Sequence, residues 1–170
     1  MELGGRMKGK VVSVNMSQKK GVSKVPVQET ELREDWGLVG DVHAGPGKRQ
    51  VSLLALEAIL RQRETLLSEG KSCPKAHGVE IGPGAFAENL TTEGLPLAEL
   101  PVGTRLKVGE AVLEITRIGK ECHTRCAIYK LLGDCVMPRE GVFARVIRGG
   151  KVRPGMEVVV YEGGHTHDKR

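Results

Sequence analysis

Glycine and proline divide this chain into short segments that are rich in valine and other β-forming residues. The sequence holds 23 glycines and 8 prolines, and both residue types interrupt regular structure. The segments Lys10–Val14, Val25–Leu32 and Met156–Tyr161 are each typical of a strand. Because only 3% of the residues are aromatic, Val, Leu, Ile and Ala must fill the core. We therefore expect a mainly β fold, a strongly bent sheet or β-barrel with one main helix and short helical segments.

A turn at Gly109-Glu110 predicts a β-hairpin within Thr104–Ile118. This register places apolar residues opposite apolar residues on one face and joins opposite charges on the other, as a correct register should. The expected pairs are Val108 with Ala111, Leu106 with Leu113, and Arg105 with Glu114.

A second hairpin is predicted within Val142–Val160, with its turn at Gly149-Gly150. It would set Arg148 opposite Lys151 and Val146 opposite Arg153, so that cations crowd one face. Like charges that face each other destabilise a hairpin, so either water screens them or an anion lies nearby.

The segment Gln50–Leu67 predicts the main helix, with Ser52 as its N-cap and Gly70 after its end. Glu57 and Arg61 are spaced to pair along it. The apolar residues expected on one face are Leu56, Ile59, Leu60 and Leu67. A shorter second helix is expected after Cys126.

The chain length of 170 residues fits one domain, which we place at residues 9–161, with a flexible leader at 1–8 and a disordered tail at 162–170. No apolar run is long enough to span a bilayer and no secretory signal is recognisable, so we expect a cytoplasmic protein. The net charge of +5 suggests an anionic partner. Few aromatic residues and no long basic run argue against nucleic acid.

Most of the soft nucleophilic chemistry lies between residues 120 and 135. Cys122, His123 and Cys126 fall there beside Arg125, and Cys135 follows. Structural zinc is one interpretation, although Cys122 and Cys126 supply only half of a usual site. Buried, inert cysteines are a second, which suits Cys135 as well as a reactive role does. A reactive or metal-ligating thiolate at Cys126 is the third, because a neighbouring cation favours the ionised thiol.

The chain resembles the MOSC domain family, found at the C-terminus of molybdenum cofactor sulfurases and as small free-standing bacterial proteins. The resemblance runs from about Gly9 to about Val160 and depends on the order of several weak motifs rather than on any one. These motifs are Gly40-Asp41-Val42-His43-Ala44-Gly45, Arg49-Gln50-Val51-Ser52-Leu53-Leu54, Phe86-Ala87-Glu88-Asn89-Leu90-Thr91, Leu106–Glu114, Lys120–Cys126 and Gly141–Val146.

The resemblance implies a β-barrel-like fold and a cytosolic role in the biology of the molybdenum cofactor, molybdopterin. Some family members reduce N-hydroxylated compounds with a cysteine on molybdenum, and the family was also proposed to carry sulfur on that cysteine. The match maps this cysteine onto Cys126. Many reductase-like members have one cysteine here, whereas this chain adds Cys122, His123 and Cys135, which leaves room for a redox pair or a sulfur relay. Any reductase activity would need an external electron donor.

Two hypotheses follow. In the first, Cys126 is the molybdenum ligand with Cys122 and His123 beside it, and the cofactor's phosphate is held by Arg125 and Arg145. His43, Glu88 and Asn89 would then line the pocket; their alternative roles are a surface histidine and an ordinary turn cap. Arg145 could equally be a solvated surface residue. In the second, the chain is a non-catalytic module, with or without structural zinc, that docks to enzymes of cofactor synthesis or sulfuration.

Overall fold

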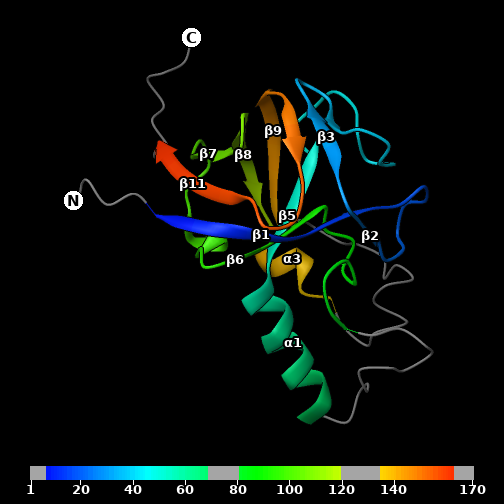
Figure 1. The fold of residues 1–170 in the computed structure, drawn as a ribbon. Coiled ribbons are helices and arrows are strands. Elements are labelled where there is room, and N and C mark those ends of the chain that lie inside the picture. The colour runs from blue at the N-terminus through cyan, green and yellow to red at the C-terminus, as the bar shows by residue number, and fades with distance from the viewer. Residues whose placement is uncertain (1–6, 69–80, 120–134, 163–170) are drawn as a thin grey trace.

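The computed structural model describes residues 7–68, 81–119 and 135–162, and within them it is a β-barrel with one main helix below it (Figure 1). The expected mainly β fold is therefore confirmed. The elements are β1 (Lys8–Met16), β2 (Val25–Val27), β3 (Thr30–Arg33), β4 (Gly37–Leu38), β5 (Val51–Ala55), α1 (Leu56–Ser68), β6 (Leu90–Glu93), η2 (Leu97–Glu99), β7 (Arg105–Val108), β8 (Ala111–Ile118), α3 (Met137–Glu140), β9 (Val142–Arg148), β10 (Gly150–Val152) and β11 (Glu157–Glu162).

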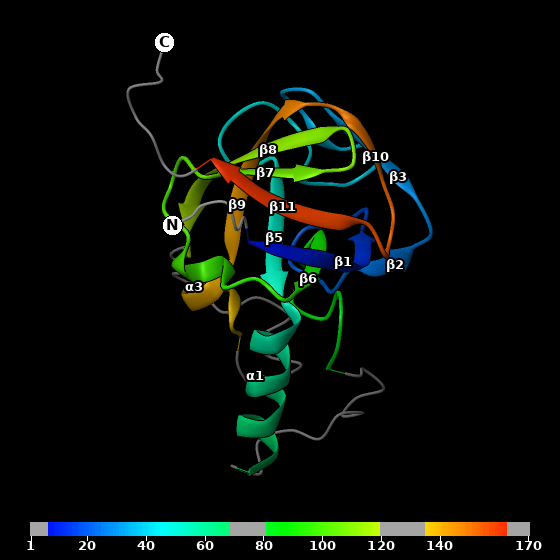
Figure 2. The ribbon, with the colours of Figure 1, turned by 60° about the vertical axis from the view of Figure 1, so that its left-hand side comes forward.

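The main sheet closes on itself because β11 pairs with β1. Its strand order is β11-β7-β8-β9-β5-β6-β1-β2, with β2 outside the closed ring. Figure 2 shows the strands wrapped around a common interior. β10, β3 and β4 form a small separate sheet beside the barrel. Closure leaves the ring strands without exposed edges.

Aliphatic side chains fill the barrel, as the low aromatic content predicts. The interior cluster consists of Val, Leu, Ile and Ala residues, among them Leu53, Leu90 and Leu113 at 0% exposure. Phe86 and Phe143 belong to a second cluster outside the barrel, which also includes buried residues of α1. β5 and β9 contribute residues to both clusters, so apolar side chains pack against both faces of the barrel wall at these two strands.

The first predicted hairpin is confirmed in its register. β7 and β8 pair with Val108 opposite Ala111, and Arg105 lies opposite Glu114 as expected. Gly109 adopts φ +60°, the left-handed conformation that such a tight turn requires of its first residue. Local alternation was enough to fix this register.

The second predicted hairpin is wrong. β9 pairs with β8 on one side and β5 on the other, so it has no edge left for the segment after Gly149. That segment instead forms β10, which pairs with β3 and places Lys151 opposite Glu31. Arg148 lies opposite Val112. The predicted row of facing cations therefore does not exist.

The main helix begins later than predicted. Residues Val51–Ala55 form β5, and Ser52 is a strand residue rather than an N-cap. β5 is buried between β6 and β9, and a strand covered on both faces has the same continuous apolar sequence as a buried helix. Arg61 pairs with Glu140 of α3, not with Glu57.

Three predictions lie wholly or largely outside the described residues: the leader, the tail and the short helix after Cys126. Residues 1–6 and 163–170 are not among them, so the leader and the tail stay predictions, although β1 already begins at Lys8. The short helix expected after Cys126 also falls outside the described ranges. Of the helices in residues 7–68, 81–119 and 135–162, none is both long and apolar enough to span a bilayer.

Candidate functional site

The cysteine motif itself lies outside the described residues. Cys122, His123, Arg125 and Cys126 fall within residues 120–134, and their assigned roles stay predictions. The last described residue before that segment is Gly119, at the end of β8. Its N–H donates to the Gly141 carbonyl oxygen at 2.6 Å. Gly119 therefore lies beside the C-terminal end of α3.

The predicted site residue His43 contacts a buried ion pair formed by Lys24 and Asp41. The Lys24 Nζ lies 2.8 Å from Asp41 Oδ1, and both side chains are 0% exposed. The same Nζ lies 3.0 Å from His43 Nδ1. The His43 side chain is 39% exposed. The three groups thus run from the interior to the surface, with the imidazole as the accessible end.

Asp41 organises the loop around this pair. Its Oδ1 accepts the Ser17 N–H and its Oδ2 accepts the His43 N–H, each at 3.0 Å. Burial alone would raise the pKa of the Asp41 carboxyl. The His43 and Lys24 side chains and those two backbone N–H groups outweigh burial and hold this pKa well below its usual range. Asp41 is therefore a fixed carboxylate that positions Lys24 and His43.

Glu88 and Asn89 are brought to the neighbouring turn, but as interior residues with 0% exposure. Asn89 Oδ1 accepts the Ser52 N–H at 3.0 Å, and its Nδ2 donates to the Asn15 carbonyl oxygen at 3.2 Å. Glu88 Oε2 accepts the Gly84 N–H at 2.8 Å. These bonds join β1, β5 and the turn before β6, so they fit the turn-cap interpretation of both residues.

Glu88 is a second carboxyl of this region whose pKa is strongly shifted, in the direction opposite to that of Asp41. Burial raises its pKa from 4.5 to about 7, against the lowering effect of the Thr91 hydroxyl and backbone N–H groups. Its Oε2 accepts the Thr91 hydroxyl at 2.6 Å. Its Oε1 is buried and has no hydrogen-bond partner in the described structure. Ionising Glu88 therefore leaves a partly unsatisfied charge in the interior.

Gly84 connects the two groups. The Lys24 N–H donates to the Gly84 carbonyl oxygen at 2.8 Å, and the Gly84 N–H reaches Glu88. Gly84 adopts φ +88° and packs so tightly that a Cβ would overlap the Lys24 carbonyl oxygen. Lys24 thus contacts His43 through its side chain and the turn before Glu88 through its backbone N–H.

Gly84→Ala is expected to lower the free energy of unfolding by about 2 kcal/mol, from the strained φ and the clash with Lys24. Urea unfolding measures it. Gly82→Ala is the matched control in the same turn, because a Cβ there meets no atom within 4 Å. Equal losses in both variants would contradict the close approach of Gly84 to Lys24.

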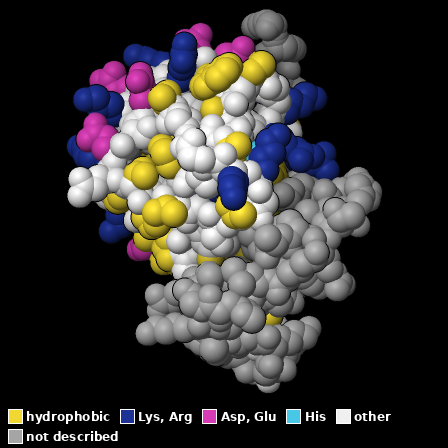
Figure 3. Space-filling model, turned by 90° about the vertical axis from the view of Figure 1, so that its right-hand side faces the viewer, with side chains coloured by type: hydrophobic (Ala, Val, Ile, Leu, Met, Phe, Trp, Pro, Cys, Tyr) yellow, Lys and Arg dark blue, Asp and Glu magenta, His cyan; other side chains and the backbone are white. Residues whose placement is uncertain are grey.

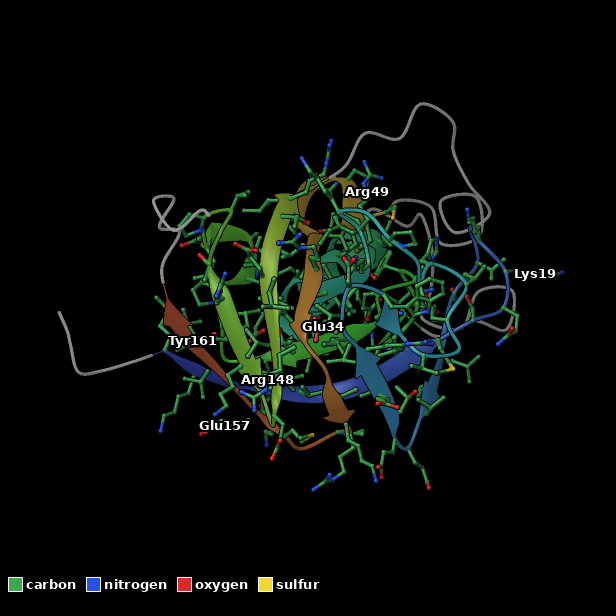
Figure 4. The ribbon with its side chains drawn as sticks, turned by 90° about the horizontal axis from the view of Figure 1, so that it is seen from above. Lys19, Glu34, Arg49, Arg148, Glu157 and Tyr161 are labelled. Atoms are coloured by element: carbon green, nitrogen blue, oxygen red, sulfur yellow. The ribbon has the colours of Figure 1, made fainter. Side chains whose placement is uncertain are left out.

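Arg145 belongs to a different surface. Its guanidinium lies 3.3 Å from Glu114 Oε1 across the β8–β9 ladder. It lines a shallow hollow of about 420 Å³ together with Lys48 and Asp35. Figure 4 shows Arg49, the neighbour of Lys48, on the opposite side of the view from Arg148 and Glu157. The described contacts of Arg145 do not include His43, Glu88 or Asn89.

Cys135 is 8% exposed and packs in the cluster that also holds Val136, Met137 and Phe143. This burial is what the inert-cysteine interpretation expects of it. In the described ranges, no three His, Cys, Asp or Glu side chains are grouped so as to hold a metal ion.

Two residues of the site and one residue elsewhere on the barrel, Arg49, have contacts that no sequence pattern predicts. Lys24 is 19 residues from His43 and belongs to no motif, so only the fold brings it close. Asp41 lies two residues before His43, and a Gly-Asp-Val-His loop was a usable signal. Arg49 stacks over the Phe143 ring at 5.4 Å. In Figure 3, Lys and Arg side chains gather beside a small histidine surface.

Comparisons with known proteins agree with this architecture. The model of the MOSC domain matches residues 39–159. The YuaD protein of Bacillus subtilis has a similar structure, with a TM-score of 0.69 and 19% identity over 93% of this chain and 99% of that one. YiiM of Escherichia coli is also similar in structure, with a TM-score of 0.65 and 20% identity over 91% of this chain and 70% of that one. For YiiM of Geobacillus stearothermophilus the TM-score is 0.64 and the identity 20%, over 91% of this chain and 75% of that one.

Among curated proteins, no sequence matches this chain. The structural likenesses, at these identities, establish the fold. The family match covers well over half of the sequence and includes the loop of Asp41 and His43 and the strand before residues 120–134. The chain belongs to the MOSC domain family.

Proposed function

We propose that this MOSC domain binds the molybdenum cofactor through the Cys126 thiolate and handles the cofactor or its sulfur, or reduces N-oxygenated compounds. The observation that carries the proposal is the family match across residues 39–159. A reductase reaction would take its electrons from an external donor. When bound, the cofactor supplies a metal centre that can exchange oxygen or sulfur atoms and electrons.

The donor set of the described site fits an anionic group. His43 is exposed at 39% and is backed by the Lys24 ammonium at 3.0 Å. The Lys24 ammonium contributes a positive charge to this group, and its ion pair with Asp41 keeps it in place. His43, with Arg125 from the cysteine motif, would hold the phosphate of the cofactor by charge-assisted and neutral hydrogen bonds.

Glu88 and Asn89 support the site from behind in this proposal. Both residues are 0% exposed. Glu88 accepts the N–H of Gly84, whose carbonyl oxygen binds the Lys24 N–H, and Asn89 connects β5 to β1. Arg145 would contribute only if its ion pair with Glu114 opened. The proposed pocket therefore has His43 at its surface and the Lys24–Asp41 pair beneath, with Glu88 and Asn89 as its scaffold.

The test is elemental analysis of protein purified without oxygen from cells supplied with molybdate. We expect close to one molybdenum per chain, and an oxidised pterin fluorescence signal after acid treatment of the same samples. Cys126→Ser should lose both signals. Cys73→Ser, which removes a cysteine outside the motif, is the control and should keep both.

A different metal would contradict the proposal. Stoichiometric zinc that disappears in Cys122→Ser or Cys135→Ser, with no molybdenum or pterin in the wild type, would favour the non-catalytic module. Retention of molybdenum in Cys126→Ser would also contradict the assignment of this cysteine as the metal ligand.

A further inference from the structure

The Lys24–His43 contact fixes which imidazole nitrogen carries the proton. A lysine ammonium has three donors and no acceptor. Because Lys24 Nζ lies 3.0 Å from His43 Nδ1, this nitrogen must accept the hydrogen bond. The proton of the neutral imidazole then sits on Nε2.

Asp41 also lies near His43 Nδ1, but farther from it than Lys24 does. Its Oδ2 lies 3.7 Å from His43 Nδ1, too far for a hydrogen bond, and already accepts the His43 backbone N–H at 3.0 Å. Asp41 Oδ1 binds the Lys24 ammonium at 2.8 Å and the Ser17 N–H at 3.0 Å. The carboxylate therefore binds the ammonium directly and holds it within hydrogen-bond distance of the imidazole.

We infer that Lys24 is a positioning residue that holds His43 as an Nε2–H donor for an oxyanion oxygen. The ring is 39% exposed while Lys24 and Asp41 are fully buried, so Nε2–H is the part of the group that a ligand can reach. A metal ion at Nδ1 is excluded by the ammonium, and a cationic ligand would meet a donor backed by a positive charge. The inference deepens the proposed function, because the phosphate of the cofactor is such an oxyanion.

The tautomer can be read directly by long-range ¹H–¹⁵N correlation on protein labelled with ¹⁵N-histidine, at pH 8. His43→Gln assigns the signal by its loss. In the wild type we expect the proton on Nε2. In Lys24→Met the Asp41 carboxylate becomes the nearest partner of Nδ1, so the proton should move to Nδ1. A proton on Nδ1 in the wild type, or an unchanged Nε2–H in Lys24→Met, would overturn the inference.

Folding of the variant does not limit this test, because the wild-type spectrum alone decides the tautomer. If Lys24→Met does not fold, the Lys24→Met/Asp41→Asn double variant removes both buried charges together. It should show a larger Nδ1–H fraction than the wild type; a spectrum like that of the wild type would contradict a role for Lys24.

Inorganic phosphate is the probe for the ligand class. Titrated into the wild type, it should shift the Nε2 signal saturably, and Lys24→Met should bind it about tenfold more weakly. Lys19→Gln is the matched control for one lost charge, because Lys19 belongs to the same loop but extends away from the barrel (Figure 4). A signal that phosphate does not shift would overturn the oxyanion assignment.

The source of the oxyanion is separated by repeating the spectrum on protein that contains molybdenum and pterin. If the oxyanion is the cofactor's phosphate, the Nε2 signal is already shifted and added phosphate changes nothing. If it still responds as in the cofactor-free protein, the oxyanion is a substrate group. Failure to load molybdenum would count against the proposed function, yet would leave the tautomer result intact.

Discussion

Asp41→Asn is expected to lower the free energy of unfolding by about 3–5 kcal/mol, measured by guanidinium unfolding at pH 7. The variant keeps an oxygen acceptor for the Ser17 or His43 N–H but removes the charge opposite Lys24. The Lys24 ammonium is 0% exposed, so it would remain buried without its counter-charge. Breaking one side of a buried pair is far more costly than the net worth of the pair.

Two controls define the cause of that loss. Lys24→Met/Asp41→Asn removes both charges and should recover most of the lost stability. Glu157→Gln breaks the ion pair between Glu157 and Lys8, in which both side chains are more than half exposed. It should change the free energy of unfolding little. A double variant no more stable than Asp41→Asn would show that lost backbone hydrogen bonds, rather than the unpaired ammonium, dominate.

The pH dependence of the same group has a definite sign. Because the folded state lowers the pKa of Asp41, its contribution is present above the ordinary aspartate range and is lost as the pH falls below about 4. Asp41→Asn should therefore show a smaller loss of stability on acidification than the wild type.

The parts of the fold that follow from local pattern could be predicted from the sequence. The β7–β8 hairpin is an example, since alternation and the Gly109 turn determine its register without any distant partner. The segment after Gly149 failed because β5 and β8 occupy both edges of β9, which is a property of the closed barrel. Likewise the sequence of β5 predicts helix, because burial on both faces removes the alternation that marks a strand.

In the candidate site too, local motifs identify some residues, whereas only the fold brings others together. His43 was identified through its motif, and its neighbour Asp41 lies in the same loop. Lys24 was missed because its role depends on the Gly84 turn and on Asp41, which are distant in sequence. The sequence predicts that Glu88 and Asn89 line the cofactor pocket; in the fold both are buried, Glu88 binds the Gly84 N–H, and Asn89 binds the backbone of Ser52 and Asn15. Sequence patterns indicate which residues are polar; they do not indicate whether each faces a ligand or the interior.

Such interior polar residues tie stability to pH in the opposite direction from Asp41. Glu88 is fully buried, and its pKa rises from 4.5 to about 7 on folding. The folded state therefore binds a proton that the unfolded state releases at lower pH. The stabilisation is complete below about pH 4.5 and declines as the pH rises through about 7. The shift corresponds to about 3 kcal/mol.

Glu88→Gln isolates this contribution, because the amide keeps an oxygen for the Gly84 N–H and the Thr91 hydroxyl but cannot ionise. The difference in free energy of unfolding between wild type and variant should move by about 3 kcal/mol in favour of the variant from pH 4.5 to pH 7.5. Urea unfolding across that range measures it. Glu110→Gln, at an exposed turn residue, controls for the loss of one negative charge.

A constant difference between wild type and Glu88→Gln would mean that the Glu88 pKa is the same folded and unfolded, against its burial and unpartnered Oε1. A slope of the expected sign would have a structural consequence for the site. Above neutral pH the ionised carboxylate should loosen the Gly84 turn that carries the Lys24 backbone, and with it the support of His43. The His43 Nε2–H preference should then weaken at high pH in the wild type, and persist in Glu88→Gln, which the same ¹⁵N-histidine spectra can record.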